Sequence, residues 1–277
     1  MKKRSIKLLA AAATLLIAPM VSIADPAGDV DTYHKVMKKK FPEVPMQEYA
    51  NGVYAIDEIK RANWEAIEEF PPYETFIDDG QAIWDKPFAN GKGYKDCFEK
   101  PGIYGDYPRW DAEKGMVTTL SLEINKCLEA NGEKPMKYGK GKIASLLAYM
   151  AYESRGVVTN IEVPNDPGAM AAYEDGKEFY FKRRGQLNFS CANCHIQSAG
   201  MNIRSEKLSP ALGHTSHFPV YRSKWGALGT LHRRFKGCNK QVRAKPFKMQ
   251  GEEYRNLEYF LTHMSNGIVL NGPGARN

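Results

Sequence analysis

The second half of this chain repeats an earlier segment, and this duplication limits the folds that the chain can adopt. When the sequence is shifted by 111 positions, Cys127 aligns with Cys238 and Pro108 with Pro219. Further matches in the same register are Tyr107 with Phe218, Trp110 with Tyr221, Thr119-Leu120 with Thr230-Leu231, Lys134-Pro135 with Lys245-Pro246, Leu146 with Leu257, Ser154 with Ser265 and Gly156 with Gly267. The register continues without a gap for about 50 residues. We therefore expect two copies of one domain, joined near residues 157–167.

The periodicity of apolar residues predicts a mainly helical chain. Residues 143–154 and 254–265 have apolar residues at helical spacing, and each segment ends before a glycine. Residues 170–182 predict an amphipathic helix, and residues 33–51 and 56–70 predict an N-terminal helical extension. Gly80 and Gly176 begin similar segments at an offset of about 95, which indicates that the repeat extends further towards the N-terminus.

A C-x-x-C-H motif at Cys191-Ala-Asn-Cys194-His195 follows the predicted helix at 170–182. Two thiols at this spacing can add to the vinyl groups on one edge of a porphyrin, and the adjacent histidine then supplies an axial nitrogen to the iron. A zinc site would need a second ligand pair at suitable spacing, and a thioredoxin-like dithiol would need alternating strands and helices. The sequence shows neither, so it predicts one covalently attached haem c.

The opposite face of the iron needs a second ligand or an open site, and Cys238 is the most specific candidate. It lies 43 residues after His195, which is enough chain to cross to the other face. Its neighbours Arg233, Arg234 and Lys236 would favour a thiolate and attract an anion. An inert buried thiol is the alternative for this residue. Other possible ligands by residue type are Met201, Met249, Met264, His214, His217, His232 and His263.

The first residues have the features of a secretory leader. Lys2, Lys3, Arg4 and Lys7 precede an apolar run that is too short to span a bilayer, and small residues precede Asp25. Cleavage after residue 24 would export the chain to the periplasm and would lower its formal charge from +7 to +3. No long run of charges of one sign remains, which argues against a nucleic-acid partner. No second long apolar segment follows, so we expect no membrane span in the mature chain.

Cys97 and Cys127 are the two remaining cysteines, and they fall in the copy without a C-x-x-C-H motif. An oxidising compartment favours a disulfide between them over two free thiols. Such a bond would stabilise a domain that lacks a cofactor in its core.

Taken together, these residues resemble the A subunit of the SoxAX cytochromes of bacterial thiosulfate oxidation. The specific part of the likeness is Arg234-Phe-Lys-Gly-Cys238-Asn, together with the duplicated chain and the C-terminal C-x-x-C-H motif. The resemblance implies an L-cysteine S-thiosulfotransferase of the single-haem type. It implies that His195 and Cys238 are the proximal and distal iron ligands, that Cys238 is the catalytic sulfur and often a persulfide, and that Arg234 binds thiosulfate. It also implies a heterodimer with a small SoxX-type cytochrome, a SoxY-type carrier protein as acceptor, and transfer of two electrons to cytochrome c.

These observations predict four segments: a signal peptide (1–24), a helical extension (25–75), a haem-less cytochrome c-like domain (76–160) and a haem-binding cytochrome c domain (161–277). Two other functions stay open from the residues alone. A plain electron-transfer cytochrome would use a methionine or histidine as distal ligand and would tolerate Cys238→Ser. A subunit with a structural haem would lose complex formation, rather than turnover, when Arg234 is changed.

Overall fold

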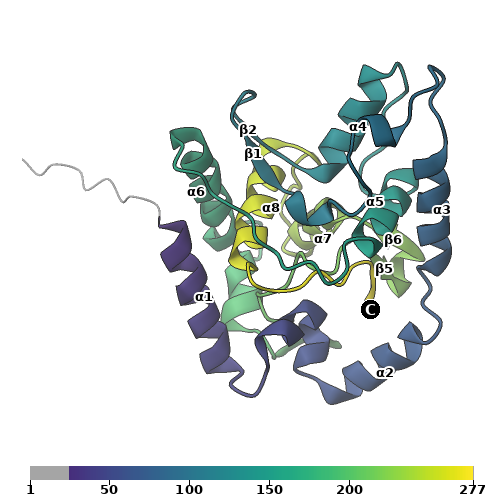
Figure 1. Cartoon of the computed structure of the whole chain (residues 1–277). Coiled ribbons are helices and arrows are strands. Elements are labelled where there is room, and N and C mark those ends of the chain that lie inside the picture. Colours follow the sequence, from purple (N-terminus) through teal and green to yellow (C-terminus); the bar gives the residue numbers. More distant parts are fainter. Residues whose placement is uncertain (1–24, 277) are drawn as a thin grey trace, which may run out of the picture.

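Helices are the main regular structure of the computed structural model, which describes residues 25–276 (Figure 1). The helices are α1 (Pro26–Lys40), α2 (Glu58–Glu68), α3 (Glu74–Asp85), α4 (Leu120–Ala130), α5 (Lys142–Tyr152), α6 (Pro167–Phe181), α7 (Leu231–Gln241) and α8 (Glu252–Met264). The helices predicted at 143–154, 170–182 and 254–265 are confirmed as α5, α6 and α8, with ends that differ by one to three residues. The predicted mainly α fold class is therefore confirmed.

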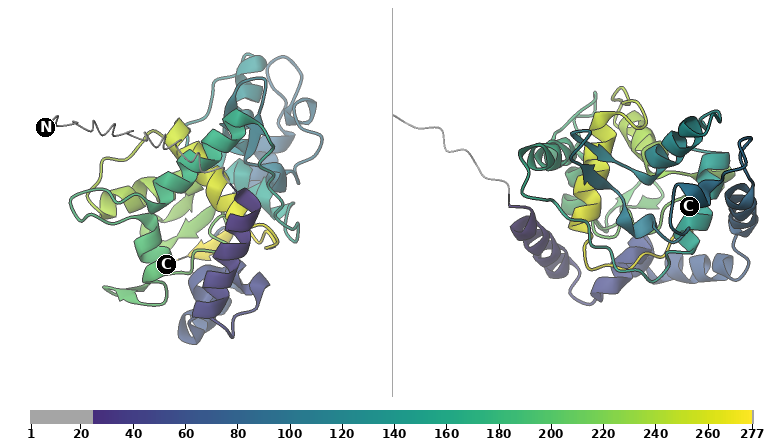
Figure 2. Two further views of the ribbon diagram at one scale, coloured as in Figure 1. Left: turned by 90° about the vertical axis from the view of Figure 1, so that its left-hand side faces the viewer. Right: turned by 45° about the horizontal axis from the view of Figure 1, so that its top comes forward.

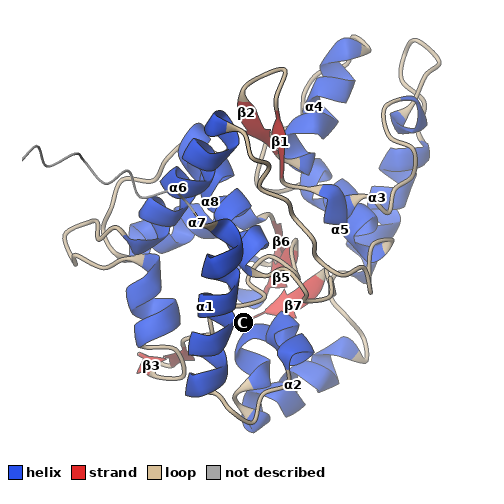
Figure 3. Cartoon of the chain, turned by 60° about the vertical axis from the view of Figure 1, so that its left-hand side comes forward, coloured by secondary structure: helices blue, strands red, loops and turns tan. Residues whose placement is uncertain are grey.

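The strands are short and form three small sheets, as the colouring by secondary structure shows (Figure 3). They are β1 (Arg109–Asp111), β2 (Met116–Thr118), β3 (Asn202–Ile203), β4 (Glu206–Lys207), β5 (Val220–Arg222), β6 (Ala227–Gly229) and β7 (Gly274–Arg276). Strands β1 and β2 pair with each other, as do β3 and β4, and the third sheet has the order β6-β5-β7. Short helical segments connect these elements: η1 (Met46–Ala55), which is interrupted at Gly52, η2 (Tyr94–Asp96), η3 (Tyr104–Asp106), η4 (Asn193–Gln197) and η5 (Ser223–Trp225).

The duplication seen in the sequence is present in the fold. Strands β1 and β2 and helix α4 have the same bounds as β5, β6 and α7 when the numbering is shifted by 111. The strand registers match as well, because Arg109 pairs with Thr118 and the equivalent Val220 pairs with Gly229. We refer to α3, β1, β2, α4 and α5 as the first copy, and to α6, β5, β6, α7 and α8 as the second copy.

Each copy brings its first and last helices together at a glycine. A Cβ atom at Gly80 of α3 would collide with the backbone carbonyl oxygen of Ser145 in α5. A Cβ atom at Gly176 of α6 would collide in the same way with Asn256 of α8, which is the equivalent of Ser145. The two glycines therefore permit the same close helix crossing in both copies. This contact places Gly80 and Gly176 at equivalent positions, as the sequence indicated.

The two copies pack against each other in a reciprocal way. Strand β2 of the first copy contacts α8, and the equivalent strand β6 of the second copy contacts α5. The backbone N–H of Thr230 donates to the carbonyl oxygen of Gly139 at 3.1 Å. With the copies exchanged, the hydroxyl of Thr119 donates to the side-chain oxygen of Gln250 at 2.7 Å. The copies are thus related by an approximate twofold axis, like the subunits of a symmetric dimer.

The N-terminal extension runs along one side of both copies (Figures 1 and 2). Helix α1 packs on the second copy, where the hydroxyl of Tyr173 donates to Asp29 at 2.7 Å. The prediction of continuous helix over residues 33–51 was wrong, because α1 ends at Lys40 and η1 begins only at Met46. Pro42 and Pro45 lie in the gap, and proline disfavours helical conformation in the residue before it.

The predicted leader lies outside the described residues. Among residues 25–276, no helix combines the length and the apolar character that a bilayer span requires.

Candidate functional site

Cys191, Cys194 and His195 lie together on one helical turn between α6 and the β3–β4 hairpin. A reciprocal pair of hydrogen bonds starts this turn. The hydroxyl oxygen of Ser190 accepts the N–H of Asn193 at 3.1 Å, and the side-chain oxygen of Asn193 accepts the N–H of Ser190 at 2.9 Å. Because the two residues cap each other, the middle residues of the S-C-A-N-C-H segment take a defined helical conformation. The turn therefore presents both thiols and the imidazole from a fixed backbone.

The ring of His195 is oriented by a main-chain atom. Its Nδ1 lies 3.0 Å from the carbonyl oxygen of Ser209. A carbonyl oxygen only accepts, so Nδ1 carries the proton and Nε2 has its lone pair free. Burial lowers the pKa of His195 to about 4, and the nearby charge of Arg234 lowers it as well. The imidazole is therefore neutral at physiological pH and has the tautomer that a metal ligand needs.

Cys238 on α7 is close enough to the two thiols of the motif to interact with them electrostatically. Burial raises the pKa of Cys191 to about 12, and the neighbouring thiol of Cys238 acts in the same direction. Burial and Cys238 also raise the pKa of Cys194. All three thiols are free and half-buried. The structure thus brings three of the predicted site residues together from two distant parts of the chain.

The first copy has a disulfide at the equivalent place. Cys127 on α4 occupies the position of Cys238, and it is bonded to Cys97 with a Cα–Cα distance of 6.0 Å. Cys97 follows α3 and η2, much as Cys191 follows α6. In each copy, therefore, a cysteine of the helix after the strand hairpin faces a cysteine of the loop before it.

A group of cations surrounds Cys238. Arg234 lies one helical turn before it on α7. Burial lowers the pKa of Arg222, the charge of Arg234 lowers it further, and Cys238 raises it, so these three groups are close enough to interact. Strand β7 places Arg276 beside Arg222 in the sheet, and burial lowers the pKa of Arg276 to about 10. The guanidinium of Arg276 lies over the rings of Tyr54 and Trp64, so its contacts are with the N-terminal extension and not with Cys238.

The other candidate distal ligands make contacts elsewhere. Met201 is 62% exposed, and Met264 is buried in the core. The sulfur of Met249 faces Gly139 of the first copy. Histidines 232 and 263 are held by hydrogen bonds to Gln250 and Ile161. The ring of His214 lies edge-on to His195 with a centroid distance of 4.4 Å, so it flanks the motif histidine rather than opposing it.

The residues around the motif fit a c-type haem. The site offers two thiols at the required spacing, a neutral imidazole with a free Nε2, and a third sulfur that can ligate iron. Four large apolar side chains near this site are exposed: Phe181, Leu187, Phe189 and Phe247. A bound porphyrin would cover them. The Nε atom of Arg184, which interacts with Cys191, is buried without a hydrogen-bond partner among the described residues. It is a donor that a haem carboxylate would satisfy.

Comparison with known proteins connects this geometry to one family. A family model described as "SoxA/TsdA, cytochrome c domain" matches residues 79–159 and 175–270. The L-cysteine S-thiosulfotransferase subunit SoxA of Allochromatium vinosum is 60% identical over 271 residues, which are 97% of this chain and 96% of the relative. The corresponding subunit of Chlorobaculum tepidum is 50% identical over 250 residues, which are 90% of this chain and 87% of the relative. The crystal structure of SoxXA from P. pantotrophus matches with a TM-score of 0.71 and 30% identity, and covers 78% of this chain and 84% of that one.

Proposed function

Because the chain belongs to the SoxA family of L-cysteine S-thiosulfotransferase subunits, we propose that it joins thiosulfate to a cysteine of a SoxY-type carrier protein, with Cys238 as the catalytic sulfur. The observation that carries this proposal is the position of Cys238. It is close enough to the two thiols of the C-x-x-C-H motif to interact with them electrostatically, and it lies one helical turn from Arg234. A plain electron carrier has no need for an arginine and a reactive sulfur at one place.

One haem c would be held by this site. Cys191 and Cys194 would form the two thioether bonds, Nε2 of His195 would be the proximal ligand, and Cys238 would be the distal ligand. When bound, the haem supplies a redox-active iron next to the sulfur of Cys238. His195 is suited to its role because Ser209 fixes its tautomer, and this part of the assignment does not depend on Cys238.

Arg234 would bind the sulfonate end of thiosulfate. A guanidinium presents parallel N–H groups that match an anion with several oxygens, and the neighbouring Arg222 adds positive charge. An anion held there would direct its outer sulfur toward Cys238, one helical turn along α7. Burial lowers the pKa values of His195 and His214, so these rings are neutral and the positive charge that would bind the anion comes from the arginines.

The overall reaction would form one sulfur–sulfur bond. The outer sulfur of thiosulfate becomes bonded to the sulfur of the carrier cysteine, the thiol of that cysteine loses its proton to solvent, and two electrons are released. The electron acceptor would be oxidised c-type cytochrome, one electron for each haem. The product is the S-thiosulfonate of the carrier cysteine.

A small c-type cytochrome of the SoxX type would be the partner subunit. The solved structure that this chain resembles is a SoxXA complex, and it covers most of the chain. The family and the leader-like residues 1–24 support a periplasmic location, to which the chain would be exported by a cleaved signal peptide.

The variant Cys238→Met tests the proposal, because methionine can ligate iron but cannot carry a transferable sulfur. Turnover would be measured with thiosulfate, carrier and partner cytochrome, by mass spectrometry of the carrier and by reduction of cytochrome c. We expect the haem to stay attached and turnover to be lost, because the variant has no transferable sulfur at this position.

The matched control is a change of the equivalent cysteine in the first copy. Cys97→Ser combined with Cys127→Ser removes two sulfurs from this copy and should leave turnover unchanged. Turnover by Cys238→Met at the wild-type rate would overturn the assignment of Cys238 as the catalytic sulfur.

A further inference from the structure

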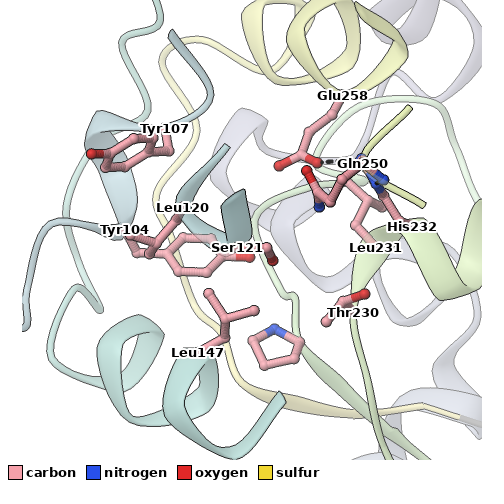
Figure 4. Close-up of a pocket in the computed structure, with 11 residues that line it drawn as sticks. Tyr104, Tyr107, Leu120, Ser121, Leu147, Thr230, Leu231, His232, Gln250 and Glu258 are labelled. Carbon is pink, nitrogen blue, oxygen red and sulfur yellow. Dashed lines mark hydrogen bonds and ion pairs between the residues drawn. The ribbon is translucent and has the colours of Figure 1, made fainter. Parts of the chain in front are cut away.

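A small cavity lies on the approximate twofold axis between the two copies (Figure 4). Its walls pair residues that the shift of 111 makes equivalent: Leu120 with Leu231, Ser121 with His232, and Leu147 with Glu258. It has room of about 20 Å³ for the centre of a water molecule, which is enough to hold one ordered water. The first copy thus contributes Ser121 and Leu147 to its side of the cavity, and the second contributes a histidine and a carboxylate.

His232 is buried at the edge of the cavity, where one ring nitrogen is hydrogen-bonded and the other lies close to a carboxylate. It is 2% exposed, and its Nδ1 accepts the backbone N–H of Gln250 at 3.0 Å. A backbone N–H only donates, so Nδ1 is unprotonated and the proton lies on Nε2. Nε2 in turn lies 2.8 Å from the Oε2 atom of Glu258, and Figure 4 shows the two side chains meeting at the edge of the cavity. His232 therefore links the first turn of α7 to the loop before α8 by a hydrogen bond, and to α8 by a close polar contact whose geometry leaves Nε2 without a hydrogen bond among the described residues.

The first turn of α7 is weakly stabilised by its own residues, so a contact from outside the helix matters there. In the equivalent helix α4, the hydroxyl of Thr119 accepts the N–H of Leu122 at 3.3 Å, and Glu123 supplies a negative charge. In α7 the side chain of Thr230 caps nothing, and Arg234 takes the place of Glu123. Positive charge at a helix N-terminus is unfavourable by about 0.3–1 kcal/mol per charge, and a lost cap costs about 1 kcal/mol. The cations that suit an anionic substrate thus weaken the helix that carries them.

We propose that His232 and Glu258 are positioning residues, which hold the first turn of α7 and thereby set Arg234 and Cys238 in the arrangement that binds thiosulfate. This inference rests on the proposed function and assigns it two further residues. The pair occurs in the second copy alone, where the first has Ser121 and Leu147. It touches neither substrate nor haem in this account, and acts through the backbone of α7.

The sharpest test replaces the pair by the pair of the first copy, in the double variant His232→Ser with Glu258→Leu. Replacing a buried polar pair by residues that pack well is often neutral for stability, and the first copy shows that this fold accepts Ser and Leu here. We expect the holoprotein to melt within a few degrees of wild type. We also expect the KM for thiosulfate to rise at least tenfold, with faster amide hydrogen exchange at residues 231–235.

Two controls separate positioning from a general change of charge or cavity. Glu252→Gln removes an exposed carboxylate from the same helix α8, and Ser121→Ala changes the opposite wall of the cavity. Both should keep the wild-type KM and the wild-type exchange of α7. If the double variant does not fold, Glu258→Gln, which keeps the size of the side chain, decides by the same measurements.

Wild-type KM together with wild-type exchange in the folded variant would overturn the proposal, as would equal changes in Glu252→Gln. The exchange measurement also keeps the two hypotheses apart. Absence of thiosulfate turnover in the wild-type protein would refute the proposed function. If the wild-type protein has no such turnover, faster amide exchange of α7 in the double variant would still show that His232 and Glu258 hold this helix. It would then refute only the link between their contact and thiosulfate binding.

Discussion

The carbonyl oxygen of Ser209 accepts the Nδ1 proton of His195 at 3.0 Å, and the hydroxyl of the same serine lies 3.0 Å from Nε2 of His214. One residue therefore orients two neighbouring imidazoles, the first through its backbone and the second through its side chain. Because the shorter bond to His195 uses a main-chain atom, a substitution at Ser209 keeps that bond, while it removes the contact of the hydroxyl with His214 and its longer contact, 3.4 Å, with Nδ1 of His195. The two roles of this serine can be separated by experiment.

Ser209→Ala should lower stability and leave the haem ligand in place. The hydroxyl is a donor to His214, and its loss leaves a half-buried nitrogen unsatisfied at a cost of about 1 kcal/mol. For a chain of this size, that cost lowers Tm by about 2–4 °C. Thermal unfolding and the haem absorption spectrum measure the two effects. Ser205→Ala, at an exposed position nearby, is the control, and a changed haem spectrum in Ser209→Ala would contradict the division of roles.

Arg234→Ala should raise the KM for thiosulfate by at least tenfold, because a hydrogen bond to a charged group contributes about 1.5–3 kcal/mol. Arg234→Lys keeps the charge but loses the paired N–H groups, so its KM should lie between those of wild type and Arg234→Ala. Steady-state kinetics at two salt concentrations measure this order. Lys240→Ala removes an exposed cation from the same helix and should have no such effect. Equal KM values for Arg234→Ala and wild type would exclude Arg234 as the anion-binding residue.

The duplication and the haem motif could be predicted from the sequence because both rest on local patterns. A single shift of 111 positions aligned Cys127 with Cys238, and the structure has the same strand register and helix bounds in both copies. The break after α1 was missed, although Pro42 and Pro45 signalled it. There the apolar periodicity of residues 33–51 was given more weight than the prolines.

The arginines near Cys238 and the contact of His232 with Glu258 depend on the packing of distant parts of the chain. Arg222 of β5 interacts with Arg234 and Cys238 of α7, and no local sequence pattern predicts that contact. His232 was considered as an iron ligand by its residue type alone. Its partner Glu258 aligns with Leu147, so the shift that revealed the repeat gave no reason to examine it. An alignment that relies on residues shared by the two copies does not reveal functional residues that only one copy has.

Asp57 gives a prediction about pH. Its carboxylate caps α2 by accepting the N–H of Lys60 at 2.9 Å, and it pairs with Lys207 of β4 at 2.7 Å. The hydrogen bond from Lys207 and that from Lys60 lower the pKa of Asp57 below its usual 3.8. A lowered pKa in the folded state means that the stabilisation is complete above pH 3.8 and is lost as the pH falls through the folded value.

Asp57→Asn keeps the cap and removes the charge, so it isolates the pair with Lys207. We expect Asp57→Asn to unfold more readily than wild type at pH 7 by at most about 1 kcal/mol, since the pair is partly exposed. The difference should stay constant down to about pH 5 and vanish below the folded pKa. Chemical denaturation of both proteins across this range measures it. A difference that grew as the pH fell would show that the pair does not stabilise the extension.

The disulfide between Cys97 and Cys127 should stabilise the first copy without affecting the site in the second copy. It closes a loop with a sequence separation of 30 residues, and a loop of this size corresponds to about 3–4 kcal/mol in the chain-entropy account. Cys97→Ser combined with Cys127→Ser should therefore lower Tm by several degrees, and wild type treated with reductant should behave alike. The haem spectrum and the KM for thiosulfate should stay at wild-type values, because the site is built from α7 and the motif turn of the second copy. A changed KM would instead mean that the stability of the first copy reaches the site through the interface where Thr230 bonds to Gly139.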